Sequence, residues 1–311
     1  MKATEFIWRN GEMVSWDDAR VHIMSHGLHY GSSVFEGIRC YDTPNGRVIF
    51  RLPEHTRRLF DSAKIYRMEV PYSQADISQA CRDIITVNKL KNAYIRPLIF
   101  FGMGTLALNA LNDCKVEVAV GAFEWGAYLG KEGIENGIEA CISSWSRTTS
   151  ASIPVLAKAG GHYMNAQLIC TEAHRNGYLE GLSVSAQGMV AEGSGENVFV
   201  VRDGKIYTPP LASSILGGIT RDSVMKIAES LGHTVIEESI PREALYISDE
   251  VFLTGTAAEV TPIKSVDKIP VGDGRPGPIT KSIQKIFFGL FGGTEEDQWG
   301  WLDKVDDSVA G

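Results

Sequence analysis

The chain has 311 residues, enough for about two domains, and its 44% hydrophobic and 22% charged residues are typical of a globular protein. The formal net charge of −8 argues against a nucleic-acid partner, which would favour a basic surface. No segment has the apolar length of a signal peptide or a membrane span, so we expect a cytoplasmic protein, with no membrane partner, that acts on small molecules.

The cysteines are five in number and widely separated, with no C-x-x-C pair: Cys40, Cys81, Cys114, Cys141 and Cys170. An odd, scattered set predicts reduced thiols that mostly fill the interior of a cytoplasmic protein. The seven histidines do not cluster with these cysteines at ligand spacing, so no metal site is expected.

In the first half of the chain, apolar residues recur at helical spacing over about residues 75–89, which predicts an amphipathic helix. Residues 116–120 alternate as a strand does. The stretch 101–115 has weak periodicity and is interpreted as a connecting loop, with a domain boundary in it or after it.

In the second half, residues 162–176 show helical spacing that Gly177 ends. An Asp-Gly turn within residues 198–207 predicts a β-hairpin. Thr220 is expected to cap the N-terminus of a helix that closes at Gly232. Strands are not regularly separated by helices, which favours an α+β fold over a doubly wound sheet. The common glycine-rich nucleotide motifs are absent from the sequence.

Lys158 lies among small residues just before the helix predicted at 162–176. Small neighbours would let a planar ligand approach the ammonium group, and partial burial would favour the reactive neutral amine. Taken alone, such a lysine is more often a solvated surface residue.

Glu192 stands in a glycine-rich segment immediately before a predicted strand, where a carboxylate could hold a ring nitrogen protonated. The segment from Leu216 to Arg221 opens a helix with two glycines, which would let amide groups and the helix dipole bind a phosphate. The turn around Thr256 could supply further amides and a hydroxyl. Exposed acids, a plain helix cap and an ordinary turn are the alternatives. Together, however, these features supply the contacts that pyridoxal phosphate requires.

Several longer motifs make the likeness specific, and it extends from about Ile7 to Val305. The motifs are His29-Tyr30-Gly31, the run from Ser33 to Arg39, Tyr94-Ile95-Arg96-Pro97, Trp125-Gly126-Ala127-Tyr128, the Lys158 and Glu192 segments, Gly255-Thr256-Ala257-Ala258, and Trp299-Gly300-Trp301-Leu302. On these motifs the chain closely resembles the bacterial branched-chain amino acid aminotransferases, which are fold type IV pyridoxal-phosphate enzymes.

The resemblance implies a small N-terminal α/β domain over residues 1–125, a connection over residues 126–136, and a larger C-terminal pseudo-barrel domain over residues 137–311. It also implies a homo-oligomer, at least a dimer, because sites in the family are completed by a partner subunit. Some relatives are hexamers.

The resemblance implies cofactor roles residue by residue. Lys158 would be the catalytic Schiff-base lysine that also moves the substrate proton, Glu192 would pair with the pyridine nitrogen, and Tyr163 would hydrogen-bond the phenolic oxygen. Arg58 would bind the phosphate with Ile219, Thr220 and Thr256, whereas Arg57 would be solvated or structural. The remaining cofactor-binding residues implied are Gly195, Asn197, Leu216 and Gly218.

Substrate roles follow in the same way. Phe35, Gly37, Trp125 and Tyr128 would line an apolar pocket, and Tyr94 with the amides of Thr256 and Ala257 would hold the α-carboxylate. Arg96, with Tyr30 of the partner subunit, would bind the distal carboxylate of glutamate. This pairing also has a physical logic, because a pocket that accepts an apolar side chain and a carboxylate needs a cation at its edge. Structural alternatives are a core ion pair for Arg96 and ordinary core packing for the aromatic residues.

Two segments depart from the family pattern. The loop over residues 102–109 keeps the family's length but not its usual sequence, and it carries Leu106 and Leu108, which are expected to shape specificity. Ser183 stands where an aspartate is common.

The implied reaction is reversible ping-pong transamination between L-leucine, L-isoleucine or L-valine and 2-oxoglutarate, giving the 2-oxo acid and L-glutamate. The alternatives are a D-amino acid transaminase or a lyase on the same fold, against which Arg96 and the aromatic pocket argue. A non-enzymatic descendant would be expected to have lost Lys158 or Glu192.

Overall fold

The computed structural model describes residues 2–126 and 128–305, so that Ala127 of the Trp125–Tyr128 motif lies outside the described residues. The described chain divides into two compact units. Unit 1 holds residues 2–126, 157–161 and 291–305, and unit 2 holds residues 128–156 and 162–290.

Two short segments make this grouping differ from the division expected at residues 125–137. Residues 157–161 belong to unit 1, where Ala159 forms an isolated bridge with Val34. Residues 291–305 also belong to unit 1, because the last described strand pairs with a strand near the N-terminus.

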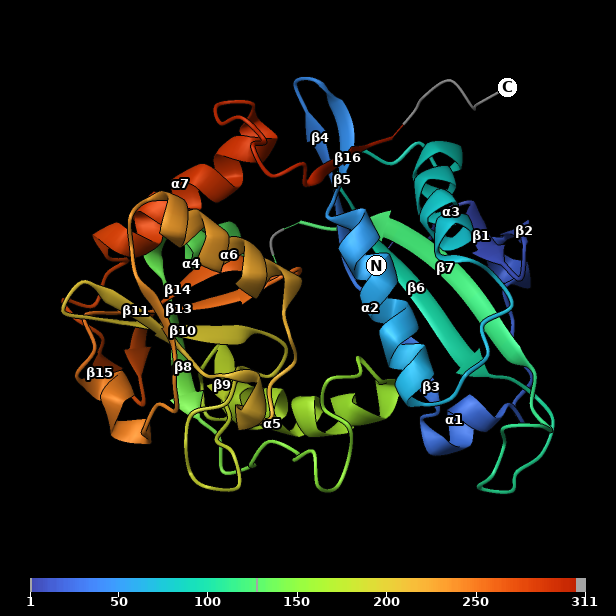
Figure 1. Ribbon diagram of the computed structural model, residues 1–311, viewed down its shortest axis with the longest axis horizontal. Helices are drawn as coiled ribbons and strands as arrows, with labels where there is room; N and C mark the ends of the chain where they lie inside the picture. The colour runs from blue at the N-terminus through green and yellow to red at the C-terminus, as the bar shows by residue number, and fades with distance from the viewer. Residues whose placement is uncertain (1, 127, 306–311) are drawn as a thin grey trace. The chain divides into compact units, whose positions relative to one another are not determined.

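Unit 1 is built on a sheet whose described strands all pair antiparallel, in the order β16-β5-β4-β6-β7-β1-β2, with β3 paired to β6 (Figure 1). The strands are β1 (Phe6–Arg9), β2 (Glu12–Ser15), β3 (Ser33–Phe35), β4 (Ile38–Thr43), β5 (Gly46–Phe50), β6 (Ala93–Phe101), β7 (Val116–Glu124) and β16 (Leu302–Lys304).

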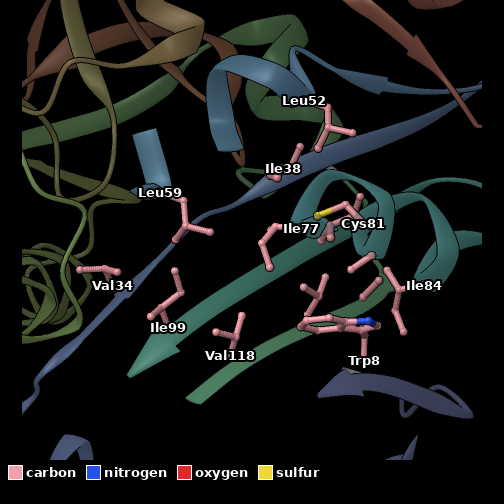
Figure 2. Close-up of a cluster of buried hydrophobic side chains, with 14 of the residues drawn as sticks. Trp8, Val34, Ile38, Leu52, Leu59, Ile77, Cys81, Ile84, Ile99 and Val118 are labelled. Carbon is pink, nitrogen blue, oxygen red and sulfur yellow. The ribbon is translucent and has the colours of Figure 1, made fainter. Parts of the chain in front are cut away.

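Two helices of unit 1, α2 (Leu52–Ile65) and α3 (Gln74–Val87), pack on one face of this sheet. Their apolar residues, such as Leu59 and Ile77, meet Ile99 of β6 and Val118 of β7 in the core shown in Figure 2. A capping box between Ser73 and Asp76 starts α3. The short helices α1 (His26–Tyr30) and η1 (Trp16–Asp18) complete the unit. Because alternate residues of a strand point to opposite faces, Arg96 and its even-numbered neighbours on β6 lie on the face away from α2 and α3.

Unit 2 contains a mixed sheet in the order β12-β11-β10-β13-β14-β8-β9, with β15 paired to β14. The pairs β11–β12, β14–β8 and β8–β9 are parallel. Its strands are β8 (Ile138–Ile142), β9 (Glu180–Leu182), β10 (Asn197–Arg202), β11 (Lys205–Thr208), β12 (Val235–Glu237), β13 (Glu250–Gly255), β14 (Glu259–Val266) and β15 (Ile269–Pro270).

The helical elements of unit 2 are α4 (Lys131–Asn136), α5 (Tyr163–Arg175), α6 (Ile219–Ser230) and α7 (Pro278–Gly292, whose last two residues fall in unit 1). Its 3-10 turns are η3 (Leu211–Ser213), η4 (Arg242–Tyr246) and the last residue of η2 (Gly160–His162), whose first two residues fall in unit 1. Valines of β10 and β13 pack with Ile138, Leu245 and Ile263 in one core of this sheet. Glu250 of β13 is buried and accepts the first amides of α7, at 2.9 Å from Ile279 N and 2.7 Å from Thr280 N, which fixes that helix to the sheet.

Most predicted elements are confirmed, with shifted ends. The helix expected at 75–89 is α3, the strand expected at 116–120 continues to Glu124 as β7, and the helix expected at 162–176 is α5. The hairpin is formed by β10 and β11, and Asp203 and Gly204 in its turn both have positive φ. The mixed α+β fold predicted from the sequence is confirmed.

Two further observations concern the described residues as a whole. None of their helices combines the length and apolarity that crossing a lipid bilayer would require. All five cysteines are unpaired, and burial raises the pKa of the Cys40 thiol to about 12 and that of Cys141 to about 11.

Candidate functional site

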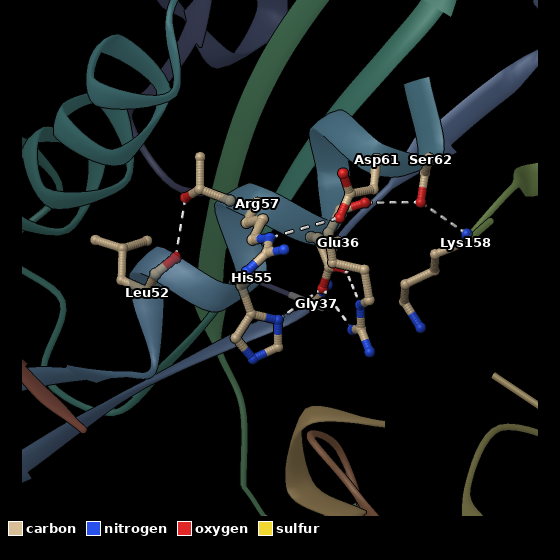
Figure 3. Close-up of polar contacts among 10 residues, drawn as sticks. Glu36, Gly37, Leu52, His55, Arg57, Asp61, Ser62 and Lys158 are labelled. Atoms are coloured by element: carbon tan, nitrogen blue, oxygen red, sulfur yellow. Dashed lines mark hydrogen bonds and ion pairs between the residues drawn. The ribbon is translucent and has the colours of Figure 1, made fainter. Parts of the chain in front are cut away.

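Lys158 lies in the short segment of unit 1 whose backbone is held from two sides. Its N–H donates to Ser62 Oγ of α2 at 2.9 Å (Figure 3), and its carbonyl accepts the N–H of Phe35 at 3.0 Å. The side chain is partly buried, and Nζ lies 5.1 Å from the centroid of the Phe35 ring. The position of this lysine is therefore specified by the fold, which a solvated surface lysine would not require.

Ser62 connects Lys158 to the helix turn that carries Arg58. The Ser62 hydroxyl accepts from Lys158 N and donates to the carbonyl of Arg58 at 2.8 Å. The serine is completely buried. One side chain thus relates the backbone of the proposed Schiff-base lysine to that of the proposed phosphate ligand.

Arg58 is held by a buried carboxylate. Its Nε donates to Glu36 Oε1 at 2.6 Å and its Nη2 donates to Glu36 Oε2 at 2.9 Å, a bidentate pair that fixes the plane of the guanidinium. His55 Nδ1 lies 2.7 Å from the same Oε2. Neither the Glu36 nor the His55 side chain reaches solvent.

Electrostatics in this cluster favour an ionised glutamate and a neutral histidine. Burial by itself raises the pKa of Glu36, but the neighbouring charge of Arg58 and the hydrogen bonds from Arg58 and His55 outweigh it and hold the pKa well below its usual range. Burial lowers the pKa of His55, and the charge of Glu36 only partly opposes this effect. We therefore assign His55 as the Nδ1–H tautomer, which leaves its buried Nε2 as an acceptor with no partner among the described residues.

Arg57, one residue before Arg58, is exposed to solvent. Its side chain is 78% exposed, and it pairs loosely with Asp61 one turn along the helix, at 3.9 Å (Figure 3). The expectation of a solvated arginine at this position is confirmed.

The sheet face opposite α2 and α3 carries Arg96 among aromatic rings. The guanidinium carbon of Arg96 lies 4.6 Å from the centroid of Phe35 and 5.3 Å from that of Tyr94. Tyr94 also packs against Trp125, with ring centroids 4.7 Å apart, and against Phe123 at 5.9 Å. The Nε of Arg96 is buried and has no hydrogen-bond partner in the described residues. A cation beside aromatic rings, with an unsatisfied donor, is the combination expected of a site for both apolar and acidic side chains.

Gly37 makes room for the phenol of Tyr94. A Cβ on Gly37 would lie 1.7 Å from Tyr94 Oη and 2.5 Å from Cζ, so any side chain here would displace the tyrosine. The absence of a side chain at Gly37 thus allows the Tyr94 ring to lie where it does, on the sheet face that carries Arg96.

The 102–109 loop is tied to α1 of the same unit. Tyr30 Oη donates to the carbonyl of Leu106 at 2.9 Å, and His26 Nε2 lies 3.1 Å from the carbonyl of Ala107. Leu106 is 38% exposed and Leu108 is 84% exposed. Tyr30 and the loop over residues 102–109 therefore lie side by side, and Leu108 is the more exposed of the two loop leucines.

Glu192, in unit 2, is buried and each of its carboxylate oxygens has a partner. Oε1 pairs with Nη2 of Arg147 at 2.7 Å. Oε2 accepts from Asn197 Nδ2 and from the N–H of Leu216, both at 3.1 Å. Asn197 Nδ2 also donates to the Leu216 carbonyl at 2.9 Å. The carboxylate is thus joined directly to the loop that leads into α6.

Ser183 supports the backbone of Glu192, which gives a structural role to this departure from the family pattern. Its N–H and its hydroxyl each lie 2.8 Å from the Glu192 carbonyl, and the serine is fully buried. The neighbouring Ala191 N–H returns a bond to the Ser183 carbonyl at 2.9 Å.

Two further glutamates of unit 2, Glu180 at the start of β9 and Glu196 just before β10, are also buried. Glu180 Oε1 accepts the N–H of Gly181 at 2.7 Å and that of Ser194 at 3.2 Å, and Glu196 Oε2 accepts the N–H of Gly195 at 3.1 Å. Burial, followed by the charge of Glu180, raises the pKa of Glu196 well above its usual value. Burial also raises the pKa of Glu180, so that both glutamates resist ionisation in the folded protein.

Helix α6 begins earlier than expected, which corrects the prediction that Thr220 caps it. The cap is Gly218, with extended backbone and no side-chain hydrogen bond, and Thr220 is a buried residue of the first turn. A side chain at Gly218 is excluded because its Cβ would lie 2.0 Å from Asn197 Oδ1. A helix N-terminus with no side-chain cap attracts anions.

Other predicted residues of unit 2 take local positions consistent with ligand contact. Tyr163 is the first residue of α5, and Thr256 and Ala257 form the turn between β13 and β14; all three are partly buried. Gly195 has open space around its Cβ position. Tyr128 is an exposed residue of unit 2.

These residues fit a phosphorylated pyridine. Glu192 supplies a buried carboxylate, and Asn197 and Leu216 place it on the loop that opens α6 with an N-terminus lacking a side-chain cap. In unit 1, Lys158 supplies the amine and Arg58 a guanidinium of fixed orientation. Each unit by itself therefore carries groups of the kinds that pyridoxal phosphate requires: an amine and a guanidinium in unit 1, and a carboxylate and a helix N-terminus in unit 2.

Sequence reasoning gave no role to Glu36, His55, Ser62 or Arg147. The sequence did indicate that Glu36 is paired. It lies within an apolar run, and a buried acid requires a partner. For Ser62 and Arg147 no such signal existed, because each acts on a residue distant in sequence.

Comparisons with known proteins found similar sequences over nearly the whole chain. The sequence model described as amino-transferase class IV matches residues 33–266. The branched-chain-amino-acid aminotransferase of Escherichia coli (strain K12) is 55% identical, over 98% of this chain and 99% of that protein. The protein of that name from Pseudomonas aeruginosa is 46% identical over 96% of this chain and 97% of its own length.

Solved structures are similar as well. The crystal structure of the Escherichia coli branched-chain amino acid aminotransferase has a TM-score of 0.96 at 55% identity and covers 97% of this chain and 100% of that one. The branched-chain amino acid aminotransferase from Thermobaculum terrenum, solved in its pyridoxal-phosphate holo-form, has a TM-score of 0.91 at 36% identity, with coverages of 98% and 100%.

Proposed function

Because this chain belongs to the amino-transferase class IV family, we propose that it transfers the amino group of L-leucine, L-isoleucine or L-valine to 2-oxoglutarate. The products are the branched-chain 2-oxo acid and L-glutamate, and the reaction is reversible. Enzymes of this class depend on pyridoxal phosphate, and so does this chain. When bound, the cofactor supplies a pyridinium ring that stabilises negative charge at the substrate Cα.

The observation that carries the choice of substrates is the position of Arg96. Its guanidinium lies against Phe35 and Tyr94, and its buried Nε has no partner among the described residues. The aromatic rings favour a branched apolar side chain, and the guanidinium favours the distal carboxylate of glutamate. One site can then serve both half-reactions, as ping-pong transamination requires.

The chain's own residues perform the remaining tasks. Lys158 Nζ binds the cofactor covalently and carries the proton that leaves and returns to the substrate Cα. Glu192 holds a proton on the ring nitrogen, and Tyr163 hydrogen-bonds the phenolic oxygen. The phosphate is proposed to contact Arg58, Ile219, Thr220 and Thr256. The α-carboxylate of the substrate is proposed to contact Tyr94 and the amides of Thr256 and Ala257.

The Glu36 network supports the proposed role of Arg58. A bidentate carboxylate orients the guanidinium before any ligand arrives, which reduces the entropy lost on binding phosphate. The aromatic residues Trp125 and Tyr128, with Phe35 and Gly37, are proposed to line the pocket for the branched side chain.

A panel of amino donors against 2-oxoglutarate, read with the cofactor absorbance spectrum, tests this function. We expect L-leucine, L-isoleucine and L-valine to react and Lys158→Ala to abolish turnover. Lys64→Ala, which changes an exposed lysine of α2, is the matched control and should react normally. Turnover of D-amino acids instead would indicate a D-specific transaminase, and pyruvate formation would indicate a lyase.

We also propose that the protein is a homo-oligomer, with a dimer as the minimum assembly. Exposed apolar side chains on and beside α1, together with Leu108, support this proposal, as does an apolar hollow of about 360 Å³ in unit 1 that Leu28, Leu98 and Arg96 help to line. Tyr30 of the partner subunit would then act with Arg96. Light scattering of the wild type and of Leu108→Asp tests the assembly, since the aspartate should shift it toward smaller species.

The reduced cysteines support a proposed cytoplasmic location. Cell fractionation would test it.

A further inference from the structure

Arg147 is buried against Glu192, the acid proposed to pair with the ring nitrogen. Its Nη2 lies 2.7 Å from Glu192 Oε1, and the side chains are 8% and 5% exposed. The backbone N–H of Arg147 donates to the Val184 carbonyl at 2.8 Å, and Nη1 lies 3.5 Å from Asn165 Oδ1 on the first turn of α5. Asn165 Nδ2 in turn donates to the carbonyl of Ser146 at 3.0 Å. The arginine is thus fixed from three directions.

The two oxygens of Glu192 have different environments. Oε1 faces the guanidinium, whereas Oε2 accepts from the side-chain amide of Asn197 and the backbone amide of Leu216. Of these three partners, Arg147 carries a full positive charge, whereas Asn197 and Leu216 contribute neutral amides. Removing Arg147 would therefore leave the carboxylate hydrogen-bonded but without its paired positive charge.

That charge matters because a carboxylate and a pyridine nitrogen share a single proton. Burial disfavours the ionised carboxylate and would move the proton from the ring to the acid. A guanidinium in direct contact opposes this transfer by stabilising the carboxylate. The ring remains an effective electron sink only while the proton stays on its nitrogen.

We propose that Arg147 is a positioning residue that acts through Glu192 to keep the shared proton on the ring nitrogen of the cofactor. The inference rests on the proposed function, and it names a residue that determines how strongly the bound ring withdraws electrons. Arg147 itself contacts neither cofactor nor substrate in this proposal.

The test follows the proton directly. Wild-type protein, Arg147→Met and Arg147→Lys are reconstituted with pyridoxal phosphate labelled with nitrogen-15 in the ring, and the nitrogen chemical shift is followed against pH. In Arg147→Met the pH at which the ring loses its proton should fall by about one unit or more, whereas Arg147→Lys, which keeps the charge, should stay close to wild type. The same midpoint in Arg147→Met as in wild type would overturn the proposal.

A matched control separates this effect from general destabilisation. Arg82→Met removes another arginine with a carboxylate partner, Asp303, at 2.8 Å in unit 1, where it contacts no candidate site residue. Its ring-nitrogen titration should match that of wild type. A shift equal to that of Arg147→Met would show that loss of any such ion pair suffices, which would also contradict the proposal.

If Arg147→Met does not fold, the double variant Arg147→Met/Glu192→Gln provides the test, because neither charge is then buried without its partner. Its ring nitrogen should titrate as in Glu192→Gln alone, since Arg147 is proposed to act only through the carboxylate. A clear difference between the two would overturn the proposal. Failure of the proposed function is distinguishable, because wild-type protein would then not attach pyridoxal phosphate to Lys158, as borohydride reduction and mass spectrometry would show.

Discussion

The hydroxyl of Ser62 bridges two residues of the proposed site, accepting from Lys158 N at 2.9 Å and donating to the Arg58 carbonyl at 2.8 Å. Lys158 is thereby held by α2 although 96 residues separate it from Ser62. The backbone that carries the proposed reactive amine is therefore anchored to α2, one turn after the proposed phosphate ligand Arg58.

Ser62→Ala should lower activity without abolishing it. The Lys158 N–H would lose its partner inside the protein, at a cost of about 1–3 kcal/mol in the free energy of unfolding. A displaced amine should lower kcat by up to about 100-fold. Ser282→Ala is the control, because the Ser282 hydroxyl bonds to the Ile279 carbonyl of its own helix at 2.8 Å. Equal kcat values for both variants and wild type would contradict the bridge's role.

Gly37→Ala should weaken substrate binding through Tyr94. The new Cβ would lie 1.7 Å from Tyr94 Oη, so the phenol must move away from its proposed α-carboxylate contact. Loss of a hydrogen bond to a charged group should raise KM for leucine and for glutamate by about tenfold or more. Gly292→Ala, which meets nothing within 4 Å, should leave both values unchanged. Adding Tyr94→Phe should cause little further loss, and a fully additive loss would argue against the mechanism.

Glu36→Gln should destabilise the protein in a pH-dependent way. Removing one member of a buried ion pair leaves Arg58 without its charge partner, which costs about 3–5 kcal/mol in the free energy of unfolding near neutral pH. The folded-state pKa of Glu36 is depressed, so its contribution is fully present above the usual value of 4.5 and is lost as pH falls below it.

Urea unfolding of wild type and Glu36→Gln across this range measures the effect. The gap in unfolding free energy should be constant above pH 4.5 and should narrow below it. Glu54→Gln breaks a half-exposed pair with Arg51 and should cost only about 0–1 kcal/mol. A gap that stays constant as the solution is acidified would mean that Glu36 is not ionised in the native state.

Glu196→Gln should show the opposite trend. The folded-state pKa of Glu196 is raised, so the native state holds a proton that the unfolded state releases, and native stability falls as pH rises above 4.5. The variant has no such proton and should gain stability relative to wild type as pH increases. Thermal unfolding against pH tests this, with the exposed Glu243→Gln as control. Parallel curves for wild type and Glu196→Gln would exclude a protonated Glu196.

Local patterns predicted the secondary structure well. The spacing of Ile77, Ile84 and their neighbours identified α3, and the Asp203-Gly204 turn identified the hairpin, because each signal lies within one element. The predicted start of α6 was wrong. Hydroxyl residues are preferred as helix caps, which favoured Thr220, but Asn197, more than 20 residues earlier, leaves room only for a glycine at position 218, and that glycine is the cap.

The candidate site divides along the same line. Lys158 and Glu192 were recognisable from their neighbours in sequence and from the family resemblance, although their proposed roles stay predictions. The residues that hold them were not recognisable. Arg147 is one of many arginines, and only the folded backbone shows that it meets Glu192. Ser62 likewise gained its role from a contact across 96 residues.

Strand β16 is an edge strand of the unit 1 sheet, where it pairs with β5, and Arg82 binds Asp303 across 221 residues of sequence. A ribosome adding about 5–20 residues per second needs roughly 10–40 s to span that interval. During that time β5 has an open edge, and Arg82 lacks its acidic partner. Unit 1 therefore cannot complete its sheet as an N-terminal piece during synthesis. Until residues 302–304 arrive, β5 presents unpaired backbone groups, which favour pairing with strands of other chains.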